Sequence, residues 1–159
     1  MSSQTQTSVS QTSTVSTHLN QLVADSYGLL GQLHLAHWNV EGESFLTLHE
    51  MFQTMYEELF VAIDDIAEQV RQLGHYSEGG LKRLAEMSNV PEAPSAKAAS
   101  ARDFVSAVLI ANEVVMNTAI DARNACGDLN DPETEDLLIG RIRVHKKADW
   151  FLKSYLAKG

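Results

Sequence analysis

The feature that most constrains this chain is one long apolar stripe between residues 45 and 73. Its large apolar residues recur in alternating steps of three and four, which is the period of a helix face rather than a strand. They are Phe45, Leu48, Phe52, Met55, Leu59, Ile63, Ile66, Val70 and Leu73. The pattern predicts a single long helix that ends at Gly74. A helix of this length favours a helical bundle, where its apolar face is buried against other helices.

The rest of the chain is also predicted to be helical. A first helix is expected from Thr17 to the turn at Gly42, a third from Ser100 to Cys126 and a fourth from Pro132 onward. A short helix over Leu81–Met87 is expected in the link that precedes Ser100. No strand pattern or internal repeat is present. The predicted fold is all-α: an antiparallel four-helix bundle with a short extra helix in the link between helices 2 and 3.

Residues 1–16 are almost entirely Ser, Thr, Gln and Val, so they are predicted to form a mobile polar tail before one domain over 17–159. The N-terminus has neither a basic nor an apolar region of the kind found in secretory signals. No apolar run is expected to span a bilayer. The single cysteine, Cys126, favours a reducing compartment. These features predict a cytoplasmic protein with no membrane partner.

The chain is acidic, with a formal net charge of -9. Nucleic acids and anionic membranes are polyanions, so an acidic chain is a poor default binder of either. An excess of carboxylates suits a protein that handles cations.

Histidines and carboxylates in and after the stretch "HWNVEGESFLTLHEMF" suggest a metal site. His37 and His49 flank a turn, so antiparallel helices would bring them together. Asp64 and Glu68 are four residues apart and share a helix face. His49 and Asp64 are 15 residues apart (64 − 49), which is roughly 22 Å along a helix axis, so one metal cannot bind both in one chain.

One chain therefore offers two half-sites, a histidine pair and a carboxylate pair. A two-fold dimer would place each histidine pair opposite the other subunit's carboxylates, giving two equivalent sites. A mixed nitrogen and oxygen site with open positions suits Fe(II). The hypothesis is an iron site shared between subunits.

The same residues resemble the Dps family, the mini-ferritins of bacteria and archaea. The resemblance rests on "HWNV-x-G" at 37–42, "LHEMF" at 48–52, "D-x-x-A-E" at 64–68 with "LG" at 73–74, and "HKKADWFLKSYL" at 145–156. It implies a ferritin-like bundle, a twelve-subunit hollow shell and ferroxidase centres at two-fold interfaces. It further implies that Fe(II) is oxidised, usually by hydrogen peroxide, and stored as a ferric (Fe(III)) mineral. His37 and His49 would come from one subunit, and Asp64 and Glu68 from the other.

The resemblance also assigns residues around the centre and at the iron entry. Trp38 matches the family's tryptophan beside the centre, where it either packs or takes up stray oxidising equivalents. Gln53 stands where many members have an acidic residue, so one carboxylate fewer predicts a weaker second iron position. In the acidic turn between the third and fourth helices, Asp131 and Asp136 are the candidates for a pore that admits Fe(II).

Several alternatives stay open at this point. A DNA-compacting shell is disfavoured because the tail has no Lys or Arg, so DNA binding is expected to be weak or absent. A catalytically weakened scaffold is supported by Gln53 alone. A four-helix di-iron oxygenase would need Glu-x-x-His motifs, and the chain has none. His34 is interpreted as a packed polar residue, and no role is assigned to His18, His75 or His145.

Overall fold

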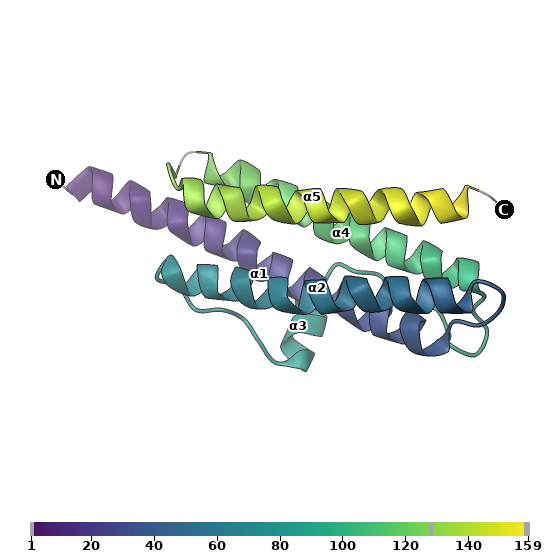
Figure 1. The fold of residues 1–159 in the computed structure, drawn as a ribbon. Coiled ribbons are helices and arrows are strands. Elements are labelled where there is room, and N and C mark those ends of the chain that lie inside the picture. The colour runs from purple at the N-terminus through teal and green to yellow at the C-terminus, as the bar shows by residue number, and fades with distance from the viewer. Residues whose placement is uncertain (1, 128, 158–159) are drawn as a thin grey trace.

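The computed structural model describes residues 2–127 and 129–157 of the chain. They form five helices, α1 (Ser2–Asn39), α2 (Phe45–Gln72), α3 (Leu81–Met87), α4 (Ala101–Cys126) and α5 (Pro132–Leu156), and no strand. Figure 1 shows the four long helices bundled side by side, with α3 in the link outside them. α2 runs back along α1, and α5 runs back along α4, so paired neighbours are antiparallel (Figure 1). The predicted all-α bundle with an extra short helix is confirmed.

The first helix begins much earlier than expected. α1 starts at Ser2, so the predicted start near Thr17 is wrong, and the mobility expected of residues 1–16 stays a prediction. Val15 and Ser16 are buried, because they lie one turn before Leu19 on the face that packs into the bundle. Serine, threonine and glutamine lower helix stability only modestly, and each added residue extends an existing ladder of hydrogen bonds.

The ends of the other helices follow local signals. At α4, the Ser100 side chain accepts a hydrogen bond from the Asp103 backbone N–H, and the Asp103 carboxylate accepts one from the Ser100 N–H. At α5, Asp131 accepts from the Thr134 N–H and Pro132 occupies the first turn. Gly74 follows α2 with a φ of +85°, a backbone conformation that glycine adopts without strain. The predicted boundaries of α2, α3, α4 and α5 are confirmed.

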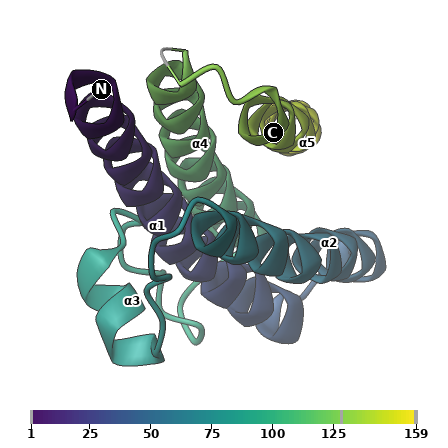
Figure 2. The same ribbon diagram turned by 90° about the vertical axis from the view of Figure 1, so that its left-hand side faces the viewer.

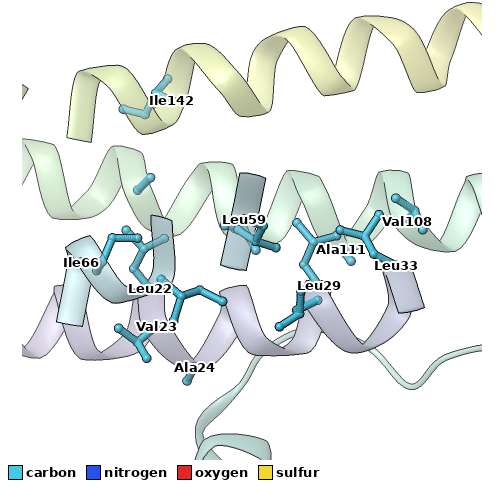
Figure 3. Packing of buried hydrophobic residues seen from close by; sticks show 14 of the residues in the cluster. Leu22, Val23, Ala24, Leu29, Leu33, Leu59, Ile66, Val108, Ala111 and Ile142 are labelled. Atoms are coloured by element: carbon cyan, nitrogen blue, oxygen red, sulfur yellow. The ribbon is translucent and has the colours of Figure 1, made fainter. Parts of the chain in front are cut away.

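The core lies where α1 meets α2 and α4. Figure 3 shows Leu29 and Leu33 from α1, Leu59 from α2 and Ala111 from α4 gathered in one cluster. α5 packs mainly against α4 and hardly touches α2, so the two helices diverge in the end view of Figure 2. A cavity of about 430 Å³ opens between them, and Glu58, Asn112, Arg141 and His145 are part of its lining.

α4 is long and apolar enough, by length and composition, to cross a membrane, and among the described residues it is the one helix of that kind. The expectation that no segment meets this criterion was therefore wrong for α4. In the bundle, Phe104, Val108 and Val115 of α4 are buried in the core, and the polar Asn112 is buried beside them. The apolar composition of α4 is that of a helix packed between α1 and α5.

A buried carboxylate anchors the link to the bundle. Asp25 of α1 is fully buried, and it accepts hydrogen bonds from the Asn89 N–H at 2.6 Å and from the Thr118 hydroxyl at 2.8 Å. Ser88 and Gln21 donate to the same carboxylate. These donors replace the water that the charge loses on burial. The link consequently lies close against α1, where Gly28 leaves room for it.

Candidate metal centre

His37 and His49 form a tightly defined pair at the end of α1 and the start of α2. Their ring centroids are 3.7 Å apart and the rings stack at 17°. His37 Nδ1 lies 2.8 Å from the His49 carbonyl oxygen, and His49 Nδ1 lies 2.8 Å from the His37 carbonyl oxygen. A carbonyl oxygen only accepts, so each Nδ1 carries the proton. In the neutral ring, each Nε2 then has a free lone pair, which is the tautomer that metal-ligating histidines use.

The turn between the two helices makes this exchange possible. Gly42 has a φ of +99°, and the Phe45 N–H donates to the Gly42 carbonyl at 3.0 Å. This tight turn sends α2 back along α1, so the last turn of one helix faces the first turns of the other. The predicted approach of His37 and His49 across the turn is confirmed.

Aromatic side chains surround the histidine pair. Tyr56 makes edge-on contacts with His34 at 4.5 Å and with His37 at 5.2 Å between ring centroids. His34 also stacks on Trp38. Burial, with a smaller contribution from His37, lowers the pKa of His34, so its ring is neutral and packed at neutral pH. Trp38 itself is 68% exposed, which leaves a large apolar surface beside the histidines for a partner to cover.

Asp64 and Glu68 lie far along the same helix from His49. α2 is continuous from Phe45 to Gln72, so the roughly 22 Å axial separation between His49 and Asp64 holds in the folded chain. Across the part of the chain that the structure describes, no three His, Cys, Asp or Glu side chains come together in a metal-binding group. The single chain therefore keeps the two half-sites apart.

The surface around the carboxylates is unusually apolar. Asp64 and Glu68 are exposed, and Phe60 and Val61 beside them are 66% and 61% exposed. Asp64, Phe60 and Val61 border a shallow hollow of about 500 Å³ that Tyr27 and Leu84 also line. Exposed apolar groups around charged ones are typical of a protein contact surface.

Gln53 and the acidic turn have partners within the chain. The Gln53 amide lies one turn after His49 and donates to Glu57 at 2.8 Å. Asp131 caps α5: one carboxylate oxygen accepts from the Thr134 N–H and the other from the Thr134 hydroxyl. Asp136 is exposed on α5. The role of Asp131 within the chain is thus structural, and a pore lined by Asp131 and Asp136 stays a prediction.

A polar cluster between α2, α4 and α5 was not predicted from the sequence. Arg141 of α5 donates to both carboxylate oxygens of Glu58 at 2.7 and 2.6 Å, and its Nε donates to His145 Nε2 at 3.1 Å. Burial, followed by the charge of Arg141, lowers the pKa of His145 to about 3. The spacing of Arg141 and His145 by four was a signal that they share a helix face. Nothing local pointed to Glu58, which is 83 residues away from Arg141.

Comparisons with known proteins agree with this architecture. The Ferritin family model, described as a ferritin-like domain, matches residues 16–159. The DNA protection during starvation protein 2 of Bacillus anthracis is 33% identical over 87% of this chain and 93% of its own length. The crystal structure of a Dps protein from Bacillus brevis has a TM-score of 0.86 at 31% identity, covering 92% of this chain and 97% of that one. Dps from Staphylococcus aureus has a TM-score of 0.83 at 32% identity, over 89% and 94%. The chain belongs to the Dps family of the ferritin-like superfamily.

Proposed function

We propose that this protein is a ferroxidase and iron-storage mini-ferritin of the cytoplasm. It oxidises Fe(II) with hydrogen peroxide at centres shared by two subunits and stores the ferric product inside a hollow shell, which protects against oxidative stress. The observation that carries the proposal is the reciprocal contact of each Nδ1 of His37 and His49 with the other's carbonyl oxygen, because it leaves both Nε2 atoms for a metal. Asp64 and Glu68 are exposed on α2, and in the proposed dimer they complete the centre that holds the partner's two histidines.

The donor set fits Fe(II) as a substrate. Imidazole nitrogen suits divalent iron, and two carboxylates bring two negative charges that offset those of one ion. Because His37 and His49 are held by backbone carbonyls, they do not have to reorganise when the ion arrives. Each half-site alone supplies two of the four protein ligands, so all four surround the ion only where two subunits meet.

The reaction consumes two Fe(II) ions, one molecule of hydrogen peroxide and two protons from the solvent. Two Fe(II) ions give one electron each to one molecule of hydrogen peroxide, its O–O bond breaks, and two protons complete two molecules of water. The products are two Fe(III) ions, which hydrolyse to mineral. The chain's own residues bind the ions and hold them in position for electron transfer. Positioning of bound reactants is the main contribution of the protein to such a step. Fe(II) and peroxide, the two reagents of hydroxyl-radical chemistry, are removed together.

The apolar surfaces beside each half-site support the proposed two-fold contact. Trp38 at the histidine end and Phe60 and Val61 at the carboxylate end are all largely exposed in the single chain. A two-fold axis applied to α2 would bring each end against the opposite end of the partner, giving two equivalent centres per dimer. Six such dimers would form the proposed twelve-subunit shell.

A mixed-subunit experiment tests whether the centres are shared. One variant carries His37→Ala with His49→Ala, and the other carries Asp64→Asn with Glu68→Gln. Each alone is expected to have little ferroxidase activity. In a random mixture half of the dimers are mixed, and one of the two centres in each mixed dimer keeps all four ligands, so about one quarter of the activity returns.

The outcome distinguishes shared centres from centres within one subunit. Activity that does not return on mixing would contradict the shared centre, provided that mixed dimers are detected by mass spectrometry. Asp65→Asn is the control for the carboxylate variant, since Asp65 is an exposed carboxylate on the same helix outside the proposed ligand set. It is expected to keep full activity.

A DNA-compacting role is the second candidate, because a relative carries the name DNA protection during starvation protein. Residues 1–16 contain no Lys or Arg and the chain has a net charge of -9, so phosphate contacts are few. We propose that DNA is bound weakly or not at all. A gel-shift experiment with plasmid DNA at about 150 mM salt, where surface charges are screened beyond about 8 Å, tests this. A clear shift of the plasmid would contradict weak binding and support the compacting role.

A further inference from the structure

We propose that Arg141 keeps metal ions out of the bundle interior by serving as a fixed internal cation between Glu58 and His145. The exclusion itself is a property of this cluster. Its consequence, that iron is directed to the subunit interface, rests on the proposed function. Arg141 is in this sense a specificity-determining residue that touches neither interfacial half-site.

The contacts of Arg141 are those that a metal ion would make at the same place. Its guanidinium spans both oxygens of the Glu58 carboxylate, at 2.7 and 2.6 Å, and its Nε reaches His145 Nε2 at 3.1 Å. The Arg141 side chain is 5% exposed and the Glu58 side chain is 43% exposed, so the cation is buried while its carboxylate partner reaches the surface. A carboxylate and an imidazole nitrogen are common metal ligands, and here both are occupied by the N–H groups of one cation.

His145 is already arranged as a ligand would be. His145 Nδ1 lies 2.7 Å from the Asn112 amide oxygen, and the Asn112 amide nitrogen donates to the His145 carbonyl at 2.9 Å. Since the amide oxygen accepts, Nδ1 carries the proton and the Nε2 lone pair points to Arg141. His37 and His49 have the same tautomer, also fixed through Nδ1. His145 differs from these two histidines because its Nε2 accepts a hydrogen bond from the Nε–H of Arg141.

The position of this cluster corresponds to that of metal ligands in other four-helix proteins. In four-helix proteins with di-iron centres, Glu and His side chains from facing helices bind the metals inside the bundle. Glu58 projects from α2 and His145 from α5, the two helices that diverge in Figure 2. The cavity of about 430 Å³ between them is lined by Glu58, Asn112, Arg141 and His145, so an ion could reach this position.

A mobile ion competes poorly with the built-in cation. A guanidinium stays protonated throughout the physiological pH range, so Arg141 cannot yield its place by losing a proton. It is also covalently attached beside its partners. A divalent ion would have to displace Arg141 and leave the charge of its guanidinium buried without a partner, which is strongly unfavourable.

Cobalt binding tests the proposal without any oxidation chemistry. Co(II) is added to protein carrying His37→Ala and His49→Ala, which removes the interfacial histidines, and the visible absorption of coordinated cobalt is followed. Adding Arg141→Ala is expected to create one new Co(II) site per subunit, and adding His145→Ala as well is expected to abolish it. Arg141→Lys, which keeps a positive charge, is expected to bind no cobalt there.

Controls separate the effect of the cluster from general destabilisation. Arg143→Ala removes an exposed arginine from the same helix and is expected to create no site. Arg141→Leu, which keeps apolar contacts along the side chain, replaces Arg141→Ala if the alanine variant does not fold by circular dichroism. A folded Arg141→Ala or Arg141→Leu variant that binds no cobalt overturns the proposal, as does cobalt bound through His145 while Arg141 is intact. Neither result bears on the mixed-subunit experiment, so the two proposals fail independently.

Discussion

His37 and His49 each donate the Nδ1 proton to the backbone carbonyl of the other over 2.8 Å, and their rings stack 3.7 Å apart. This reciprocity fixes both tautomers at once. It also makes each histidine hold the other, because neither ring can rotate without losing a hydrogen bond. Preorganised ligands of this kind bind metals more tightly than mobile ones, since less freedom is lost on binding.

Replacing either histidine is expected to slow iron oxidation. His37→Ala removes one nitrogen ligand and the hydrogen bond that orients His49, so we expect the rate to fall at least about tenfold, the lower end for losing a ligand-orienting partner. Stopped-flow absorbance of ferric formation, with Fe(II) added anaerobically and peroxide second, measures it. His18→Ala is the control. Equal, slow oxidation in wild type and His37→Ala would instead support a catalytically weakened scaffold.

Gln53→Asp is expected to strengthen the weaker of two iron positions. The Gln53 amide is one turn from His49 and now donates to Glu57, so a carboxylate there adds a negative charge next to the centre. We expect the weaker step in an anaerobic Fe(II) calorimetric titration to tighten about tenfold, or about 1.4 kcal/mol. Gln53→Asn, which adds no charge, is expected to have no such effect. Two equal, tight steps in the wild type would contradict the premise.

Gly28→Ala and Gly31→Ala are expected to change stability in opposite directions. A Cβ at Gly28 would lie 2.7 Å from the Ser88 hydroxyl oxygen and 2.8 Å from Val90 Cβ, whereas one at Gly31 would meet nothing within 4 Å. We expect Gly28→Ala to lower the free energy of unfolding by about 1–3 kcal/mol through overpacking. Gly31→Ala, within the same helix, is expected to raise it by about 0.5–1 kcal/mol. Urea denaturation of both variants measures the difference, and equal effects would contradict the close packing of the link.

Acid is expected to destabilise the fold in part through His145. Its pKa falls from 6.5 to about 3 on folding, so below about pH 6.5 the unfolded chain binds a proton that the folded chain excludes. The contribution is fully present at neutral pH and is lost as the pH falls toward 3, with a limiting slope of about 1.4 kcal/mol per pH unit. Denaturation midpoints between about pH 7 and pH 4 should therefore fall more steeply in the wild type than in His145→Gln. Parallel curves would mean that His145 can be protonated in the folded chain.

The sequence by itself determined most of the helices and the division of the candidate ligands into two half-sites. The spacing of Phe45, Leu48 and Phe52, and the signals at Ser100 and Pro132, act over a few residues, so they could be interpreted without knowing what the helices touch. The rise per residue of a helix is enough to show that His49 and Asp64 of one chain are too far apart to share a metal. The short turn at Gly42 likewise predicted that His37 and His49 meet.

Only the tertiary structure decided how the distant groups combine. Whether α1 begins at Ser2 depends on packing and helix propagation rather than on a cap at Thr17. The pairing of Arg141 with Glu58 depends on the angle at which α5 lies against α4 and α2, and no local spacing encodes it. Periodic patterns act along the chain, whereas these contacts depend on how separate helices pack.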